Sequence, residues 1–236
     1  MSDNHEMIRA SGLVKVFGLR PVLRGMNFSV ARGSIVAVLG ANGSGKTTLL
    51  RILAGLSRPS AGELTIGGWT IPKEITAIRS QLGLVGHQTL LYDDLTAEEN
   101  LRFYARLYNV DRPAERVAEA LERVELAKRS GDLLRTFSRG MQQRLAIARA
   151  MLHDPAILLL DEAYTGLDIN GAAMLDGLLR SWHEAGRTIL MTSHDLEHAA
   201  AFSDHVLIIS QGRIAIDAPA ASIGDLRATF EQVTAG

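Results

Sequence analysis

The sequence predicts an α/β fold with a mostly parallel sheet core, an N-terminal antiparallel β subdomain and an α-helical insertion lobe. Three observations lead to this fold class. Short β-rich segments alternate with glycine-containing turns in residues 8–84, a helical period takes over in residues 96–152, and wholly apolar strands alternate with helices from residue 156 onward. Strand–helix–strand order with continuously apolar strands is typical of a parallel sheet covered on both faces.

The first region contains three strand-like segments, at residues 28–30, 35–39 and 63–66. Their β-branched and aromatic residues favour strands, and the glycines between them favour turns. We expect the antiparallel β subdomain in this region.

The middle region is predicted to be helical. Thr96 and Glu99 have the spacing of a capping box, in which each side chain satisfies the other's backbone N–H at a helix start. Apolar side chains then share one helical face, and the pattern repeats after Pro113. These positions are Leu101, Ala105 and Tyr108 in the first stretch, and Val117, Ala120, Leu121 and Val124 in the second.

The last region alternates strands and helices. Strands are expected at residues 156–160, 188–192 and 206–210, a helix around residues 175–182, and a hairpin turn into residues 213–217. No linker interrupts the sequence, so we predict a single domain over residues 1–236. Its core lobe comprises residues 1–86 and 153–236, and residues 87–152 form the helical lobe.

Composition excludes several kinds of function. The 236 residues include no cysteine, which excludes a disulfide framework, a zinc–thiolate site and a cysteine nucleophile. A formal net charge of −1 without a Lys/Arg run argues against nucleic-acid binding. The polar, acidic first residues are unlike a signal peptide, and every apolar run is far shorter than the ~20 residues that span a bilayer. We therefore expect any membrane role to come through a partner protein.

A phosphate-binding loop follows the strand at residues 35–39. Residues 40–47 complete the pattern G-x-x-x-x-G-K-[ST] and precede a predicted helix at residues 48–54. Backbone N–H groups and the helix N-terminus would cradle phosphates, Lys46 would supply a full positive charge, and Thr47 a hydroxyl for Mg²⁺. The nucleotide-binding residues expected here are Gly40, Ala41, Asn42, Gly43, Ser44, Gly45, Lys46, Thr47 and Thr48. The motif predicts a P-loop NTPase with a RecA-like core.

Two carboxylates end a later apolar strand. Asp161 and Glu162 follow residues 158–160 directly. Because adjacent side chains of a strand point in different directions, the two carboxylates can have different roles. We expect Asp161 to hold Mg²⁺ through water and Glu162 to activate the attacking water.

A second helix start narrows the class of NTPase. Residues 137–144 read F-S-R-G-M-Q-Q-R, with Ser138 as the expected N-cap and Gly140 leaving room for a close backbone approach, so this helix N-terminus is a second anion site. The segment resembles the ABC signature motif, usually written L-S-G-G-Q. By this resemblance the chain is identified as a member of the ABC ATPase family. The resemblance implies ATP contacts from Ser138, Arg139, Gly140 and Met141.

Three other segments are similar to motifs of this family. Residues 165–168 resemble the D-loop, which implies that Asp168 lies at the nucleotide. Residues 193–195, Ser-His-Asp, resemble the switch-histidine motif, which implies that His194 contacts the γ-phosphate. Phe17 occupies the position where the family stacks adenine, although on its own Phe17 is better explained as a core residue.

The family resemblance also implies partners. In ABC ATPases the phosphate loop of one subunit faces the signature helix of the other, so a second copy of this chain would complete two composite sites for ATP and Mg²⁺. Integral membrane transporter subunits would dock at the Q-loop region, which is the first segment of the helical lobe in the sequence. The chain would then be peripheral, on the cytoplasmic face of the inner membrane, and ATP hydrolysis would drive transport.

The sequence departs from the family pattern at several positions. Arg139 and Met141 replace a glycine and a glutamine of the signature, a form common in exporter-type members. Ala163 follows Glu162 where the family usually has proline, which puts the orientation of the carboxylate in question. In the Q-loop, His87 and not Gln88 falls at the family's catalytic glutamine. Either His87 supplies that contact or Gln88 swings in, and both stay candidates.

A finer resemblance concerns the cargo. Residues 86–88, Gly-His-Gln, and residues 95–104 are similar to the ATP-binding subunit of the cytochrome c maturation haem exporter. This implies a role in haem export with no direct haem contact by this chain. An ABC-2-type exporter of a drug, lipid or polysaccharide is one alternative. A soluble, non-transporter ABC ATPase is another, although such proteins usually have two ATPase halves or a long basic or coiled-coil insertion.

Overall fold

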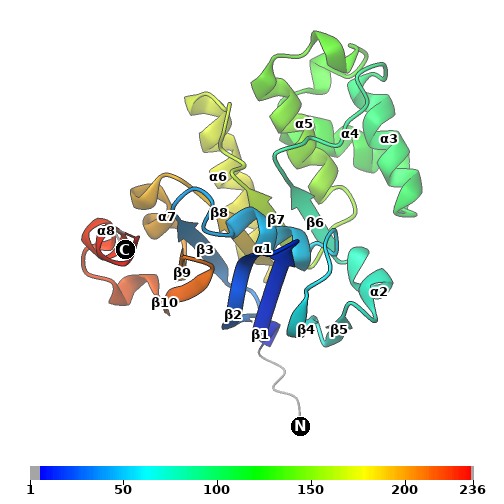
Figure 1. Cartoon of the computed structure of the whole chain (residues 1–236). Coiled ribbons are helices and arrows are strands. Elements are labelled where there is room, and N and C mark those ends of the chain that lie inside the picture. The colour runs from blue at the N-terminus through cyan, green and yellow to red at the C-terminus, as the bar shows by residue number, and fades with distance from the viewer. Residues whose placement is uncertain (1–5, 235–236) are drawn as a thin grey trace.

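The computed structural model describes residues 6–234 and contains two β-sheets with helices packed around them (Figure 1). The larger sheet has six strands in the order β10-β9-β3-β8-β7-β6, and the smaller has four in the order β2-β1-β4-β5. The strands are β1 Glu6–Phe17, β2 Arg20–Ala31, β3 Ile35–Gly40, β4 Ala61–Ile66, β5 Trp69–Ile71, β6 Leu82–Val85, β7 Ile157–Asp161, β8 Thr188–Thr192, β9 His205–Ser210 and β10 Arg213–Pro219. The α-helices are α1 Lys46–Leu53, α2 Ile75–Arg79, α3 Ala97–Leu107, α4 Pro113–Arg123, α5 Arg139–Met151, α6 Ile169–Glu184, α7 Leu196–Phe202 and α8 Leu226–Thr234. The predicted α/β fold class is confirmed.

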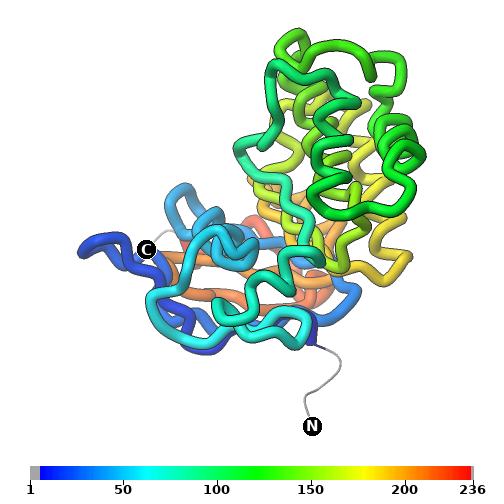
Figure 2. The backbone as a smooth tube through the Cα atoms, turned by 90° about the vertical axis from the view of Figure 1, so that its right-hand side faces the viewer, coloured from blue at the N-terminus to red at the C-terminus, as the bar shows by residue number. Residues whose placement is uncertain are grey.

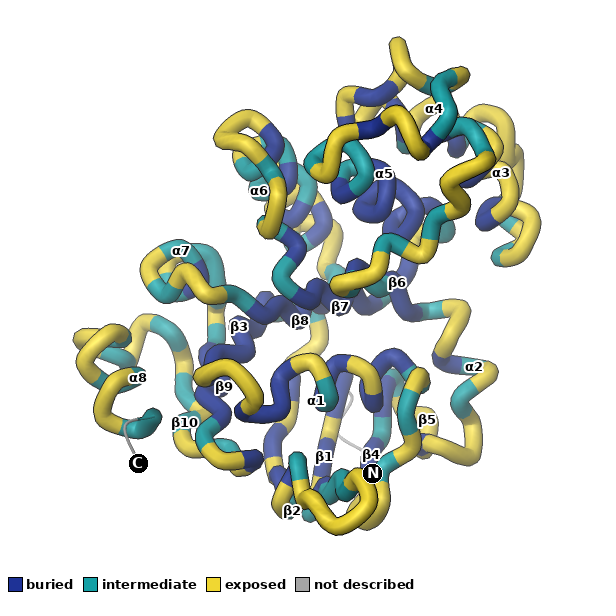
Figure 3. Tube along the Cα trace, turned by 45° about the horizontal axis from the view of Figure 1, so that its top comes forward, coloured by how far each residue is buried: buried dark blue, intermediate teal, exposed yellow. Residues whose placement is uncertain are grey.

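The larger sheet is mostly parallel. Strands β6, β7, β8, β3 and β9 run in the same direction, and β10 returns antiparallel to β9 as the predicted hairpin. Ile35, Ala37 and Leu39 of β3 join the core on the side of the helical lobe. Val36 and Val38 alternate with them and join the core that contains α1 and the smaller sheet. Both faces of these strands are therefore buried, as Figure 3 shows for the centre of the molecule.

The smaller sheet is the antiparallel β subdomain. Strand β1 pairs antiparallel with β2 on one side and β4 on the other. Helix α1 buries Leu49, Leu50, Ile52 and Leu53 in the core shared with this sheet. The sheet thus supports α1 and, through it, the loop between β3 and α1.

Helices α3, α4 and α5 form the helical lobe between β6 and β7, and Figure 2 shows this lobe standing above the sheets. The predicted capping box opens α3, because Thr96 and Glu99 exchange hydrogen bonds of 2.8 and 3.1 Å. The buried side chain of Asn100 also holds the backbone N–H and carbonyl of Tyr92, at 2.8 and 3.0 Å. The segment that connects β6 to α3 is therefore tied to the lobe. No helix within residues 6–234 is long and apolar enough to cross a bilayer.

Candidate nucleotide site

The predicted phosphate loop connects β3 to α1 through a sharp turn. Gly45 is the N-cap of α1 with a φ of 114°, a left-handed conformation that favours glycine. A Cβ at Gly45 would also lie 2.7 Å from Leu23 Cδ2. Lys46 begins the helix and donates from Nζ to the carbonyl oxygens of Gly40 and Ala41, at 2.6 and 3.1 Å. The ammonium group therefore lies over the loop.

The electrostatics of this loop suit a polyphosphate. Lys46 is buried, and burial lowers the pKa of its ammonium group, while Glu162 and Asp161 act in the opposite direction. The buried hydroxyl of Ser44 has no hydrogen-bond partner among the described residues. A buried cation and an unpaired hydroxyl beside a helix N-terminus are groups that an anion would satisfy.

Asp161 and Thr47 fit Mg²⁺. Both line one cavity of about 460 Å³, and Asp161 is a buried carboxylate at the end of β7. Mg²⁺ is usually held by one or two protein oxygens together with waters and substrate phosphates. No cluster of three or more His, Asp or Glu side chains that could hold a metal by themselves occurs in residues 6–234. When bound, the ion would neutralise charge that develops on the phosphates.

Glu162 has a different environment from Asp161, in agreement with two separate roles. Its backbone is in the left-handed region, with a φ of 55°, and its N–H donates to Thr192 Oγ1 at 3.0 Å. Its carboxylate lies 2.7 Å from Nε2 of His194. The structure therefore brings the predicted base and the predicted switch histidine together, beside the cavity that Asp161 lines.

Both Q-loop candidates face this cavity. His87 and Gln88 are exposed and line the 460 Å³ cavity with Thr47, Asp161 and Glu162. His87 also lines a second cavity of about 440 Å³ that Asp161 and Glu162 border from the side of the helical lobe. His87 thus borders the carboxylates in two cavities and Gln88 in one.

This difference predicts which residue matters for turnover. We expect His87→Ala to lower kcat for ATP hydrolysis by roughly 10-fold or more, because a group that positions water is lost. His87→Gln should keep kcat near that of the wild type, since an amide can hold the same water. Steady-state phosphate release measures both variants. Gln88→Ala is the matched control, and a larger loss of kcat there than in His87→Ala would reverse the assignment.

The predicted signature segment caps α5 as expected. Ser138 is the N-cap, and its Oγ accepts the N–H of Met141 at 3.3 Å. A Cβ at Gly140 would lie 2.9 Å from the carbonyl oxygen of Gly166, so the space that glycine leaves here is taken by the predicted D-loop. The signature and the D-loop are therefore in direct contact within one chain.

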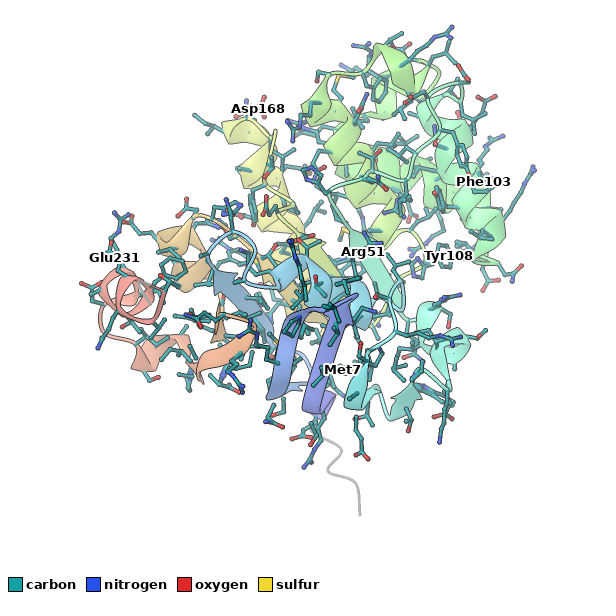
Figure 4. The ribbon with its side chains drawn as sticks, viewed as in Figure 1. Met7, Arg51, Phe103, Tyr108, Asp168 and Glu231 are labelled. Atoms are coloured by element: carbon teal, nitrogen blue, oxygen red, sulfur yellow. The ribbon has the colours of Figure 1, made fainter. Side chains whose placement is uncertain are left out.

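Arg144 joins the same region. Its guanidinium donates to Glu125 at 2.6 Å and to Asp168 at 3.2 Å. Asp168 is the N-cap of α6. The hydrogen bond from the N–H of Gly171 lowers the pKa of the Asp168 carboxyl group below its usual value, and Arg144 lowers this pKa further. Figure 4 shows Asp168 at the end of α6. Asp168 lines a cavity of about 550 Å³ with Ser138, Arg139, Gly140 and Met141.

The two predicted halves of the site do not meet in one chain. Ser138 and Gly140 line the 550 Å³ cavity, whereas Thr47, Asp161 and Glu162 line the 460 Å³ cavity. Arg139 borders both the signature cavity and the 440 Å³ cavity beside Asp161. Ser138 and Gly140 of the signature and Thr47 of the phosphate loop thus line different cavities of one chain.

Phe17 is not a core residue. It ends β1, is 53% exposed, and has the ammonium group of Lys15 4.7 Å from its ring centroid. The reading of Phe17 as core, which its sequence alone favoured, is therefore wrong. An exposed ring is free to stack on a base.

Two buried polar residues of the site were not predicted from the sequence. Thr192 contacts both Asp161 and Glu162, and Gln143 donates to the carbonyl oxygen of Ala163 at 2.9 Å. The sequence contains only weak indications that these two residues belong to the site. Thr192 ends an apolar strand next to Ser193 and His194, and Gln143 lies five residues after Ser138.

The phosphate loop follows the parallel strand β3, and two carboxylates lie at the end of β7, which β8 separates from β3 in the same sheet. This arrangement defines a P-loop ATPase fold. The family model described as "ABC transporter" matches residues 23–165. Together with the relatives below, this match shows that the chain belongs to the ABC transporter family, as an ATP-binding subunit. The predicted family is thereby confirmed.

Three curated relatives are named as ATP-binding proteins of drug resistance or Nod factor export. The chain is 34% identical to the linearmycin resistance ATP-binding protein of Bacillus subtilis, over 88% of this chain and 68% of that protein. It is 37% identical to a daunorubicin resistance ATP-binding protein of Streptomyces coeruleorubidus, over 88% of this chain and 66% of that protein. A Nod factor export ATP-binding protein of Ralstonia nicotianae is also 37% identical, with 65% of its length covered. The chain thus spans about two thirds of the length of these relatives.

Solved structures agree on the fold. A dimeric ATP-binding cassette in a post-hydrolysis state bound to ADP and phosphate superposes with a TM-score of 0.84, at 27% identity over 91% of this chain and 99% of that chain. The ATP-binding subunit of an ABC transporter gives a TM-score of 0.86, at 28% identity over 96% of this chain and 94% of that chain.

These comparisons bear on the expected cargo. The relatives just described are named for drug resistance and Nod factor export, and not for haem export. The finer resemblance to the haem exporter is therefore unconfirmed. The alternative of an ABC-2-type exporter is the one that these relatives favour.

Proposed function

We propose that this chain is the ATP-hydrolysing subunit of an ABC-2-type exporter whose cargo is a drug-like, lipid-like or saccharide molecule. Two copies bind ATP and Mg²⁺ head to tail, and membrane-embedded subunits convert closure and reopening of the dimer into transport. The chain is then peripheral, at the cytoplasmic face of the membrane. The observation that carries this proposal is the separation of the phosphate loop and the signature helix onto two surfaces of one chain.

Each site residue has a role in this proposal. Lys46 and the loop N–H groups bind the β- and γ-phosphates, and Thr47 and Asp161 hold the metal. Glu162 takes a proton from the attacking water, with His194 at 2.7 Å to orient the carboxylate and contact the γ-phosphate. On the partner copy, the Ser138 helix start contacts the same γ-phosphate from the other side. The names of the drug-resistance and Nod factor relatives support the cargo class.

The contact with the membrane subunits is proposed at an exposed apolar surface beside the Q-loop. This Q-loop patch comprises Leu56, Leu90, Tyr92, Phe103 and Leu107, all of which are exposed. Leu56 and Leu90 border the 460 Å³ cavity, and the rings of Tyr92 and Phe103 meet edge to face with centroids 5.1 Å apart. Figure 4 shows Phe103 on α3 of the helical lobe. Clustered exposed apolar side chains are typical of a protein interface.

Phe103→Glu is expected to abolish co-purification with the membrane subunits, because a charge would be buried in an apolar interface. Its ATP binding should be unchanged, since Phe103 lies outside the phosphate loop. Affinity purification from membranes followed by identification of the retained proteins measures the effect. Trp69→Glu, at an exposed aromatic residue on β5, is the control and should retain the partners. Equal retention by Phe103→Glu would place the docking surface elsewhere.

Haem export is kept as a second candidate because His87 faces the site where the family has glutamine. Identifying the membrane subunit that co-purifies with this chain distinguishes the two candidate functions. If amphiphilic drugs stimulate the ATPase activity of this chain when it is reconstituted with that subunit in proteoliposomes, the first candidate is supported. Loss of haem-containing cytochrome c in cells that lack this chain supports the second. A protein that purifies with ribosomes or DNA and no membrane subunit contradicts both.

A further inference from the structure

One buried hydroxyl links the carboxylate of Asp161 to the backbone N–H of Glu162. Thr192 Oγ1 accepts the N–H of Glu162 at 3.0 Å and donates to Asp161 Oδ1 at 2.9 Å. Thr192 ends β8, is 1% exposed, and pairs in register with Asp161 at the end of the parallel strand β7. A threonine hydroxyl has one donor and two acceptor sites, so it can make both hydrogen bonds at once. The same atom therefore orients the proposed metal ligand and the proposed base.

The backbone of Glu162 needs such support. Its φ of 55° lies in the left-handed region, which residues with bulky side chains occupy only where their surroundings hold them there. A second contact fixes the same turn from the helical lobe, where Gln143 Nε2 on α5 donates to the carbonyl oxygen of Ala163 at 2.9 Å. The turn is thus held on one side by β8 and on the other by α5. In this conformation the carboxylate of Glu162 reaches His194 at 2.7 Å.

A buried threonine can also be a purely structural residue, and the same strand provides an example. Thr188 begins β8, is fully buried, and accepts the N–H of Gly33 at 2.9 Å. Its hydroxyl satisfies a backbone group at the opposite end of the strand and touches no residue of the site. Thr192 differs from it because both of its partners are site carboxylate residues.

We infer that Thr192 is a positioning residue for ATP hydrolysis: it orients the carboxylate of Asp161 and, with Gln143, holds the turn that presents Glu162. This inference rests on the proposed function, in which Asp161 holds Mg²⁺ and Glu162 activates water. Thr192 acts through these two residues, so its loss affects turnover and the metal requirement more than nucleotide affinity.

Thr192→Val keeps the shape of the side chain and removes the hydroxyl. We expect kcat for ATP hydrolysis to fall by roughly 10–100-fold and the half-saturating Mg²⁺ concentration to rise, the usual effect of losing a group that orients a metal ligand. The affinity for ATP in the absence of Mg²⁺ should stay unchanged, because the phosphate loop is untouched. Thr192→Ser keeps the hydroxyl and should restore most of kcat. Steady-state hydrolysis, Mg²⁺ titration and binding of a fluorescent ATP analogue measure these quantities.

Thr188→Val is the matched control. It removes a buried hydroxyl from the same strand, so it should lower thermal stability by a similar amount and leave kcat and the Mg²⁺ requirement unchanged. If Thr192→Val does not fold, Gln143→Met releases the same turn from α5 and should lower kcat in the same direction. Two outcomes would overturn the inference: equal kcat values for folded Thr192→Val and Thr188→Val, or a Thr192→Ser variant that does not restore turnover. If Gln143→Met is used in place of Thr192→Val, a wild-type kcat in that variant would also overturn it.

The Glu162→Gln variant separates this inference from the proposed function. If Glu162→Gln hydrolyses ATP at the wild-type rate, the assignment of the base fails, and with it the premise of the inference. If Glu162→Gln is inactive and Thr192→Val has wild-type kcat, only the positioning role fails. When both are correct, adding Thr192→Val to Glu162→Gln lowers the residual rate by less than Thr192→Val does alone, because both substitutions act on one step.

Discussion

Glu162→Gln is expected to bind ATP, accumulate as a closed ATP-loaded dimer and lose hydrolysis by roughly 10²–10⁴-fold, the usual contribution of a general base. Glutamine has the shape of glutamate but cannot take a proton from water at neutral pH. The hydrogen bond from residue 162 to Thr192 uses the backbone N–H, so it survives the substitution. Removing one negative charge near Lys46 also lowers the repulsion that ATP meets in the site.

Single-turnover hydrolysis and analytical ultracentrifugation with Mg²⁺ and ATP measure the two parts of this prediction. Glu197→Gln is the control, because Glu197 is a carboxylate on α7 that pairs with Arg227 on the surface. It should hydrolyse ATP and cycle between monomer and dimer like the wild type. Normal hydrolysis by Glu162→Gln would show that another group activates water. A hydrolysis-deficient variant that stays monomeric with ATP would contradict the head-to-tail dimer.

The buried strands could be predicted from sequence because their signal is local. Strands β3, β7, β8 and β9 are covered on both faces, so each is an unbroken apolar run between turns. Strand β1 is only half covered, and its pairing shifts between Ala10 and Leu13, which breaks the alternation that would have marked it. Helix α7 buries only Ala199, so it has no apolar stripe to recognise. The sequence does not predict helices α2 and α8 for a similar reason, since neither presents a run of buried residues.

The residues of the candidate site are also of two kinds: some belong to a local sequence motif, and others meet only through the fold. Lys46 lies in the phosphate-loop motif that follows β3, and Asp161 and Glu162 lie at the end of β7, so a continuous motif indicates each of them. Thr192 reaches Asp161 only because β7 and β8 pair in that register. Gln143 reaches Ala163 only because α5 packs against β6, the strand that pairs with β7. Contacts of this kind depend on residues that are distant in the chain, and composition or periodicity gives no sign of them. His87 and Gln88 lie in a loop, and both line one cavity of the site, but only His87 also lines the second cavity beside Asp161 and Glu162.

One chain contains both the phosphate loop and the signature helix, but the two line different cavities. In the proposed function, one chain alone therefore does not form a complete site for ATP hydrolysis. The helix N-termini of α1 and α5 are the two predicted anion sites, and their residues line different cavities. In the proposed function, a nucleotide in the phosphate loop would leave its γ-phosphate open on the side that the signature helix of the same chain does not reach. A second copy related by two-fold symmetry can cover that side with its own Ser138 helix start, and it receives the same contact in return.

Lys46→Ala is expected to weaken ATP binding by roughly 10–100-fold, which corresponds to the loss of about 1.5–3 kcal/mol for a hydrogen bond to a charged group. Without the ammonium group, the triphosphate faces only loop N–H groups and a helix dipole that contributes about 0.3–1 kcal/mol. Isothermal titration calorimetry measures the affinity, and Lys128→Ala, on the surface of the helical lobe, is the control and should bind like the wild type.

Complementation extends this prediction to the dimer. Ser138→Arg should bind ATP in its own phosphate loop but fail to cover the partner's nucleotide, because the arginine side chain fills the space at the helix start. Lys46→Ala and Ser138→Arg chains are each expected to be inactive alone. A mixed dimer contains one site with an intact phosphate loop and an intact signature, so mixing should restore hydrolysis above that of either variant. If mixing restores none, the two sites do not work as independent composites of a phosphate loop and a partner's signature helix.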